Sequence, residues 1–226
     1  MNQHQVMNIS YDLIIVSQSS PELIPMTQQT IDSARQDDCD LNIIVIETGQ
    51  PYKYDVNRII EYNGQFNYNR ALNMGLKYSK GDVSILANND LVFHAGWSAI
   101  GELMVLNDFH SASALSPSCG IEKGNFVYEG YLIGSIFTGW CLFMDRYCRE
   151  TIGKLDESVN FWYSDNIYAL QLQKAGIRHG LFCNIHVDHL TSRTLIKQPA
   201  NVQRQYQRGE HSKYLHRKTH YGRTSV

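Results

Sequence analysis

The sequence predicts a single α/β domain built on a mostly parallel central sheet. Three short apolar runs, at residues 13–16, 43–46 and 83–87, are nearly continuous rather than alternating. This is the pattern of strands that are buried on both faces of a parallel sheet. Segments with helical spacing lie between the runs, and the 226 residues are enough to bury a substantial core.

The first half of the chain contains two expected helices. The first lies between Ser20 and Arg35, where Ser-Pro-Glu supplies a cap and a first turn and Pro25 delays the regular helix. An extended segment follows at residues 58–62, and a second helix is expected at residues 69–80. Together with the apolar runs the order is β-α-β-β-α-β, which is typical of a nucleotide-binding half-sheet.

The second half of the chain is less regular. A helix is expected at residues 97–106, and an apolar run at residues 139–144 resumes the sheet. Residues 165–175 have the pattern of a helix that a glycine ends. Residues 116–134 contain four glycines and one proline, which is the composition of a long surface loop. Loops of this length are often lids or binding loops, although disorder fits the same composition.

The charge is balanced over the whole chain but not at its end. Lys and Arg number 20 against 22 Asp and Glu, so no overall field demands a polyanionic partner. We expect one domain over residues 1–200 and a basic tail or helix over residues 201–226. Six Lys or Arg and three His lie between Arg204 and Arg223, against the single acid Glu210. A solvated helix or frayed tail is expected there, and contact with phosphates, an anionic membrane or an acidic protein is the alternative.

The cysteines indicate the cellular compartment, and the lengths of the apolar runs bear on membrane segments. The five cysteines show neither close pairing nor a metal-finger spacing, which predicts reduced thiols in a cytoplasmic protein. No run approaches the roughly 20 apolar residues of a membrane span, and the N-terminus does not combine a basic region with an apolar stretch. We therefore expect no transmembrane segment.

The first candidate site residue follows the third apolar run. That run ends in Asn88-Asn89-Asp90, and a buried strand that delivers a carboxylate to its carboxyl end places a metal ligand at the crevice of an open α/β sheet. A turn between two strands is the alternative, because Asn and Asp tolerate left-handed backbone.

Three landmarks occur in order along the chain. They are a first strand opening into Ser17-Gln18-Ser19-Ser20, the Asn-Asn-Asp turn, and GWCLFMDR followed by FWYSDNIYALQLQKAG. On these motifs the chain resembles, over residues 12–194, the inverting family 2 glycosyltransferases of the GT-A (nucleotide-diphospho-sugar transferase-like) fold. The resemblance implies transfer of a sugar from a nucleotide-diphosphate sugar to an acceptor hydroxyl, with inversion and with Mn²⁺ or Mg²⁺.

The resemblance also implies a role for each matching residue. Asp90 corresponds to the carboxylate that holds the cation, and His189 falls where relatives often carry a histidine that reaches the metal or the diphosphate. Asp165 corresponds to the catalytic base. Contacts with the nucleotide sugar are implied for Ser17, Glu47, Arg70, Asn73, Asn88 and Asn89. Asn88 and Ser164 stand where relatives often carry acids, so two negative charges are missing from the pattern.

Each of these residues also has a simpler interpretation. A carboxylate at a helix N-terminus, such as Asp165, stays ionised and can accept a proton, but most such aspartates are ordinary caps. His189 and His186 would otherwise be polar residues at a strand end. Glu47 would otherwise be a strand-end acid. The aromatic residues Trp140 and 161–163 would form either a sugar-stacking wall or part of the core.

Two other functions compete with the transferase. A non-catalytic protein that binds a sugar nucleotide or a glycan is favoured by the two acid-to-neutral departures. A nucleotidyltransferase would need a basic glycine-rich loop after the first strand, which residues 17–21 lack. The acceptor is left open among a saccharide, a lipid-linked precursor, a protein and a hydroxylated DNA base.

Overall fold

A computed structural model describes residues 8–190 and 200–222 of the chain. The strands are β1 (Ser10–Ser17), β2 (Asp40–Glu47), β3 (Arg58–Glu61), β4 (Val83–Asn88), β5 (Leu91–Phe93), β6 (Ser111–Leu115), β7 (Val127–Glu129), β8 (Cys141–Asp145) and β9 (His179–His189). The helices are α1 (Ile24–Ala34), α2 (Tyr68–Leu76), α3 (Ile100–Leu106), α4 (Arg146–Ile152), α5 (Ser164–Ala175) and α7 (Ala200–Gly222), with short 3₁₀ turns η1 (Trp97–Ala99) and η2 (Pro117–Cys119).

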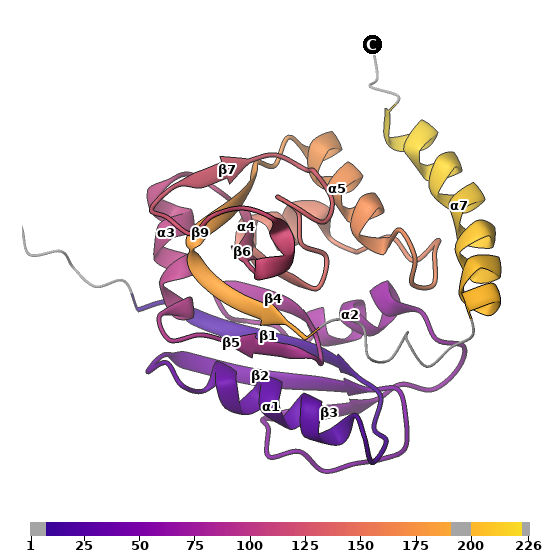
Figure 1. Ribbon diagram of the computed structural model, residues 1–226, viewed down its shortest axis with the longest axis horizontal. Coiled ribbons are helices and arrows are strands. Elements are labelled where there is room, and N and C mark those ends of the chain that lie inside the picture. Colours follow the sequence, from indigo (N-terminus) through magenta and orange to yellow (C-terminus); the bar gives the residue numbers. More distant parts are fainter. Residues whose placement is uncertain (1–7, 191–199, 223–226) are drawn as a thin grey trace, which may run out of the picture.

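The strands form one sheet in the order β3-β2-β1-β4-β8-β6-β9-β5, with β7 paired to β9 (Figure 1). The first four strands of this order are parallel, as expected. Beyond β4 the sheet is mixed, because β8 runs antiparallel to both β4 and β6, and β9 antiparallel to β5 and β7. The α/β class is therefore confirmed, and the parallel part of the described sheet continues into a mixed part beyond β4.

Helices cover both faces of the sheet, and alternate residues of the inner strands point to opposite cores. Leu13 and Ile15 of β1 face a core shared with α1, η1 and α3. Ile14 and Val16 face a second core shared with α2, α4 and α5. The continuous apolar runs therefore arise because each inner strand is buried on both faces.

The predicted helices are present with shifted ends. α1 begins at Ile24 with Pro25 in its first turn, so Ser20, the expected cap, lies before the helix and Leu23 is the N-cap. α2 starts one residue before the expected range and ends earlier, at Leu76, and its N-cap is Asn67, whose side chain accepts a hydrogen bond from the backbone N–H of Arg70 (2.9 Å). α5 ends at Gly176, which has φ +67°, the left-handed conformation that glycine adopts most easily.

The segment 116–134, expected to be a surface loop, contains regular structure. η2 lies at its start, and β7 pairs with residues 180–182 of β9. Val127 packs against the core, and Cys119 is buried. These contacts form because β9, which the sequence pattern did not single out, is long enough to pair with several strands. The lid function proposed for this segment stays a prediction.

The basic segment near the C-terminus is helical. α7 runs alongside α5 at the edge of the molecule (Figure 1) and contacts it. Arg204, Arg208, Lys213 and Lys218 are exposed, whereas Glu210 is buried. Among the described residues, no helix is both long enough and apolar enough to cross a membrane.

Candidate functional site

The carboxyl ends of β1, β2 and β4 lie side by side. Ser17 is in register with Glu47, and Val16 with Asn88. In parallel α/β sheets this edge forms the ligand crevice. The sequence-predicted residues Ser17, Glu47 and Asn88 are therefore brought together at one edge of the sheet.

Asp90 and His189 form a buried pair at this edge. β5 and β9 run antiparallel, and Leu91 lies opposite His189. Because Asp90 directly precedes Leu91, the side chains of Asp90 and His189 come together. Asp90 Oδ1 lies 3.2 Å from His189 Nε2, and the side chains are only 5% and 12% exposed. Neither of these two buried atoms has a hydrogen-bond partner. Buried polar atoms normally make a hydrogen bond. An oxygen and a nitrogen that face each other without one therefore suggest a site for a ligand held between them.

The turn that precedes β8 links this pair to the second carboxylate. The indole ring of Trp140 stacks on the imidazole of His189, with centroids 5.3 Å apart and planes at 16°. The carbonyl of Trp140 accepts a hydrogen bond from the backbone N–H of Asn88 (2.9 Å). The neighbouring residue, Gly139, lies against the side chain of Asp165. The turn thus has the metal-site candidates on one side and the candidate base on the other.

Asp165 lies in the first turn of α5 and is partly buried. Its Oδ1 accepts a hydrogen bond from the backbone N–H of Asn166 (2.8 Å). Burial raises the pKa of Asp165, although hydrogen bonds from backbone N–H groups, including that of Asn166, lower it in part. A Cβ at position 139 would lie 2.5 Å from Asp165 Cβ and 2.8 Å from its Oδ2, so only a glycine leaves room for this carboxylate.

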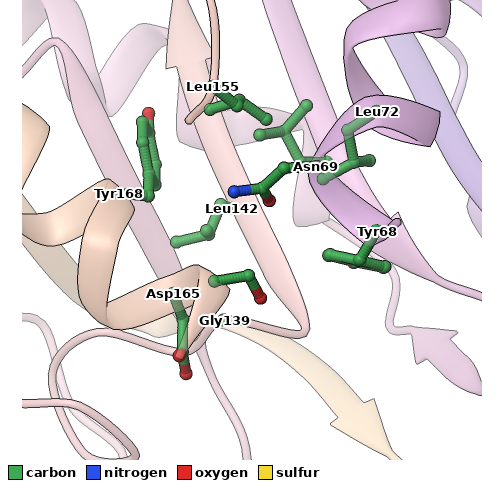
Figure 2. A pocket seen from close by; sticks show the side chains of 10 residues that line it. Tyr68, Asn69, Leu72, Gly139, Leu142, Leu155, Asp165 and Tyr168 are labelled. Carbon is green, nitrogen blue, oxygen red and sulfur yellow. The ribbon is translucent and has the colours of Figure 1, made fainter. Parts of the chain in front are cut away.

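Figure 2 shows the pocket between α2, β8 and α5. Its lining is mostly apolar, with Leu142 and Tyr168 deep in it. Asp165 lies at its end beside Gly139, with the carboxylate directed away from Leu142 and Tyr168. The carboxylate therefore lies outside the apolar part of the pocket, on the side of Gly139.

Tyr68 connects the two halves of the site, and sequence reasoning did not select it. Its hydroxyl donates to Asn88 Oδ1 (2.7 Å) and is fully buried. Burial raises the pKa of the Tyr68 phenol, and the charges of Asp90 and Asp165 raise it further. Tyr68 also lines the pocket that Asp165 borders, so it lies between Asp165 and Asn88, two residues before Asp90.

Ser17 and Asn89 belong to a buried hydroxyl network. Ser17 Oγ lies 3.1 Å from Thr27 Oγ1 and 3.2 Å from the Tyr54 hydroxyl. Asn89 Nδ2 donates to the same Thr27 hydroxyl (3.0 Å). These contacts fix the strand ends around α1, so the two side chains support the edge of the site from within.

Glu47 is 2% exposed at the end of β2. Its Oε1 accepts hydrogen bonds from the backbone N–H groups of Ser19 and Gly49, both at 2.7 Å. Its Oε2 is buried without a hydrogen-bond partner. One oxygen therefore orders the loop after β1, and the other is left for a ligand group.

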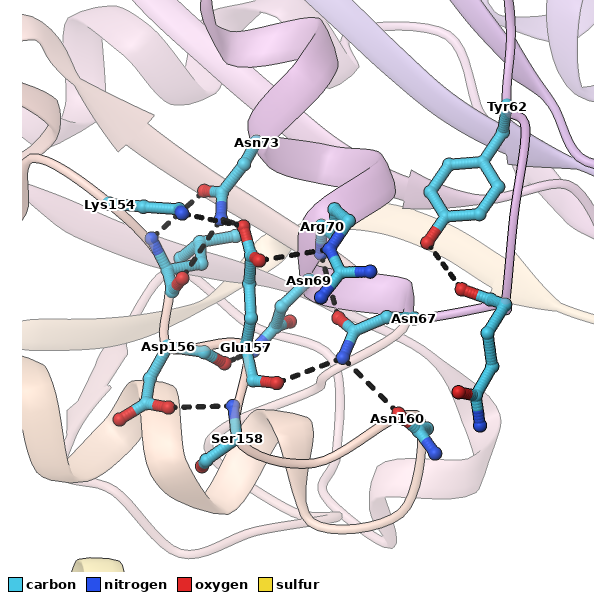
Figure 3. A network of polar contacts seen from close by, with 12 residues as sticks. Tyr62, Asn67, Asn69, Arg70, Asn73, Lys154, Asp156, Glu157, Ser158 and Asn160 are labelled. Atoms are coloured by element: carbon cyan, nitrogen blue, oxygen red, sulfur yellow. Dashed lines mark hydrogen bonds and ion pairs between the residues drawn. The ribbon is translucent and has the colours of Figure 1, made fainter.

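Arg70 and Asn73 are occupied by the loop that precedes α5 (Figure 3). Asn73 Nδ2 donates to the Leu155 carbonyl and to Glu157 Oε1, and its Oδ1 accepts from the Leu155 N–H, all at 2.9 Å. Arg70 pairs with Glu157 Oε2 at 3.0 Å. This geometry gives both side chains a loop-holding role, and the nucleotide contact that the resemblance implied for them stays a prediction. Gly75, on the same helix, packs against Ile14 of β1.

The remaining candidates are placed as follows. His186 lies on β9 beside His94, with ring centroids 5.9 Å apart, and its Nε2 is buried without a partner. Phe161 packs edge-on against Tyr68 and borders the second core, as the core interpretation requires. Within the described ranges, no cluster of three or more His, Cys, Asp or Glu could hold a metal, so the Asp90–His189 pair has no third protein ligand of these types.

Two residues of the candidate site were not identified from the sequence. Tyr68 has no motif of its own, and Gly139 opens the GWCLFMDR landmark without a role assigned to it. The usable signal was weak: an aromatic residue at the first position of α2, and a glycine directly before a tryptophan in the turn that faces an acidic helix start. Only the packing of α2, β8 and α5 shows their importance.

Comparison with known proteins gives a fold and no family. No protein-family model and no curated protein matches the sequence. A mannosyltransferase from Pyrobaculum calidifontis, solved in complex with GDP-Man and Mn²⁺, has a similar structure, with a TM-score of 0.67 and 12% identity over 95% of this chain and 65% of that chain. GalNAc-T7, solved with UDP, GalNAc and Mn²⁺, gives a TM-score of 0.65 and 10% identity over 80% of this chain and 44% of that chain.

These likenesses are structural. The chain spans 44% and 65% of the lengths of the two solved proteins, and the low identities carry the architecture alone. The predicted fold class is confirmed: this is a mixed α/β domain with a central sheet, structurally similar to GT-A glycosyltransferases.

Proposed function

We propose that this protein is an inverting glycosyltransferase that uses a divalent cation to move a sugar from a nucleotide-diphosphate sugar to an acceptor hydroxyl. One observation carries the proposal. A buried, unpartnered Asp90–His189 pair and the raised-pKa carboxylate of Asp165 flank the same turn at the ligand edge of the sheet.

The Asp90–His189 pair fits a cation of the manganese or magnesium type. Neighbouring ligand atoms of an octahedral ion held at about 2.1 Å lie about 3.0 Å apart, and the observed separation of Asp90 Oδ1 and His189 Nε2 is 3.2 Å. When bound there, the ion would supply positive charge for the leaving diphosphate. The few protein ligands leave room for phosphate oxygens and water to complete its shell.

Asp165 is suited to be the base. Inversion requires an in-line attack by the acceptor hydroxyl on the anomeric carbon, with a group behind that hydroxyl to take its proton. The pKa of Asp165, raised by burial, makes the carboxylate more basic while the start of α5 favours its ionised form. In this proposal the attacking hydroxyl passes its proton to Asp165 as the new glycosidic bond forms.

The donor binds across the ends of β1, β2 and β4. The Oε2 of Glu47, which has no hydrogen-bond partner, would accept a hydrogen bond from a ribose or base. Ser17, Asn88 and Asn89 act by holding this edge through Thr27 and Tyr68. Specificity for one base or sugar depends on pocket shape, so the donor stays open.

The acceptor and the location belong to the same proposal. A saccharide, a lipid-linked precursor, a protein and a hydroxylated DNA base all present the hydroxyl that the mechanism needs. The cytoplasm is favoured by the five free thiols. A non-catalytic protein that binds a sugar nucleotide is the second candidate, and it is favoured by the neutral residues Asn88 and Ser164.

The test is a thermal-shift panel of nucleotide sugars with Mn²⁺ or Mg²⁺. A donor at 100 times its Kd adds about 2.7 kcal/mol to the stability of the folded state, or about 5–10 °C for a chain of this size. We expect one donor to give such a shift, and chelator or the Asp90→Asn variant to remove it. Asp38→Asn, at an exposed aspartate before β2, should retain it.

The outcomes separate the two functions. A metal-dependent shift accompanied by release of the nucleoside diphosphate supports the transferase. A shift without turnover, with any acceptor class, supports the binding protein instead. Absence of a shift with every donor and both metals would overturn the proposal.

A further inference from the structure

The loop that leads into Asp165 is held from two sides. This base loop, residues 153–163, joins α4 to α5 without regular structure of its own. On one side it is held at the start of α2, where Asn67 Nδ2 donates to the carbonyl of Glu157 (2.9 Å) (Figure 3). The same nitrogen donates to the carbonyl of Val159 (2.8 Å), and the backbone N–H of Tyr68 donates to the carbonyl of Asn160 (2.7 Å). On the other side it meets α7.

Glu210 of α7 holds the end of the base loop. It is 6% exposed and is the only acidic residue of α7. Its two carboxylate oxygens accept hydrogen bonds from the backbone N–H groups of Asn160 (2.6 Å) and Phe161 (3.1 Å). Hydrogen bonds to an ionised acceptor are roughly twice as strong as neutral ones. These N–H groups lie only a few residues before Asp165, so Glu210 fixes the chain directly before the base.

Tyr163 makes a second contact between the base loop and α7. It is the N-cap of α5 and has φ +66°, a left-handed conformation that is rare for a residue with a side chain. Such a conformation persists when its surroundings hold it in place. The ring of Tyr163 stacks on Tyr214 of α7, with centroids 5.0 Å apart and planes at 7°.

Asp156 anchors the start of the base loop to the same helix. Arg217 of α7 pairs with its Oδ2 at 2.9 Å, and the Tyr221 hydroxyl donates to that oxygen at 2.9 Å. Burial alone would raise the pKa of Asp156, but hydrogen bonds from Ser158 and Tyr221 and the charge of Arg217 lower it overall. Glu210, Tyr214, Arg217 and Tyr221 thus form one stripe of α7, spaced by three or four residues, that faces the base loop.

We propose that α7 is a clamp that sets the position of Asp165, with Glu210 as its main positioning residue. The inference rests on the proposed role of Asp165 as the base, and it joins the segment 201–226 to the site functionally. Arg204, Arg208, Lys213 and Lys218 of α7 are exposed, while Glu210, Arg217 and the two tyrosines make the contacts. Removing Glu210 leaves two backbone N–H groups unsatisfied and frees the start of α5.

The experiment compares full-length wild type, Glu210→Ala and Glu210→Gln. We expect kcat to fall about 10- to 100-fold in Glu210→Ala, because small displacements of a reacting group carry costs of this size. Glu210→Gln keeps an acceptor oxygen and should lie between the two. Donor-induced thermal stabilisation should stay unchanged, since the contacts seen for α7 in the described part of the chain go to α5 and the base loop. The exposed Lys213→Ala on the same helix is the matched control.

Two further readouts separate positioning from general loss of structure. Burial raises the pKa of Asp165, so freeing α5 should lower it and move the acidic limb of the kcat–pH profile to lower pH. Hydrogen exchange of the amides at residues 160–167 should accelerate in Glu210→Ala and not in Lys213→Ala. Unchanged exchange there overturns the clamp even if no donor is found. If Glu210→Ala turns over substrate with the kcat and the pH profile of wild type, the positioning role is overturned and the proposed transferase activity stands.

Discussion

The two halves of this molecule build the candidate site in different ways. In the first half, β1, β2, β3 and β4 pair in parallel, and the side chains at their carboxyl ends meet as a direct result of register. In the second half, β9 returns across the sheet to place His189 opposite Leu91, and a loop held by distant helices presents Asp165. Strand register alone thus assembles the candidate donor edge, whereas the candidate reacting groups also depend on a loop and on helices distant in sequence.

This difference predicts which substitutions separate binding from chemistry. Substitutions of Asp165 or of Gly139 beside it should lower turnover and leave donor binding at the ends of β1, β2 and β4 intact. Changes in the contacts between α2 and the base loop should act on stability first. The predictions below run from the largest expected effect to the smallest.

Asp165→Asn should give the largest loss. A general base contributes typically 10²- to 10⁴-fold, so we expect kcat to fall by about that factor while donor-induced stabilisation persists. Stability should move the other way. Because the folded-state pKa is raised, the folded protein holds this proton more tightly than the unfolded chain, and wild-type stability falls as pH rises from the ordinary carboxyl pKa through the raised one.

The Asn variant lacks that titration. Its melting temperature should equal or exceed that of wild type at neutral pH, and the difference should shrink below about pH 4, near the ordinary aspartate pKa. Asp38→Asn serves as the exposed control. Retained turnover in Asp165→Asn would remove the base assignment, whatever the stability shows.

Gly139→Ala tests the space beside the base. The added methyl group would lie 2.8 Å from Asp165 Oδ2, so the carboxylate or the start of α5 must shift. We expect a loss in kcat of about 10- to 100-fold, with donor-induced stabilisation preserved. Steady-state kinetics with the donor found in the thermal-shift panel would measure it.

A glycine with open surroundings supplies the control. An added Cβ at Gly209 of α7 meets nothing within 4 Å, so Gly209→Ala should keep full activity. Equal kcat values for Gly139→Ala and wild type would show that Asp165 tolerates displacement, which contradicts a positioned base.

Asn73→Ala distinguishes loop support from nucleotide contact. Its amide makes three hydrogen bonds to Leu155 and Glu157, and losing them should cost about 2–3 kcal/mol of stability, or about 5–10 °C in melting temperature. The effect on donor binding should be small. Calorimetry and a donor titration on the same sample give both numbers.

The exposed Asn184 offers the comparison, since Asn184→Ala should leave the melting temperature unchanged. A large loss of donor affinity with unchanged stability in Asn73→Ala would restore the nucleotide contact that the motif implied.

Much of the first half was predictable because its signals are local. Strand runs and the β-α-β-β-α-β order follow from periodicity and backbone preference, as does, in the second half, the glycine that ends α5. The antiparallel entry of β8, the pairing of β7 and the course of β9 did not follow. Short apolar runs carry no information about direction, and pairing partners lie far apart in sequence.

The sequence by itself determined that Asp90 ends a buried strand region and that Asp165 begins a helix, because both depend on neighbouring residues. Only the tertiary structure decided that His189 meets Asp90 and that Gly139 yields space to Asp165. It also decided that Asn73 and Glu210 hold the base loop from opposite sides. The physical reason is that a local pattern fixes an element and its exposed end, whereas the partner of a buried polar atom is fixed by the packing of segments that the chain brings together only on folding.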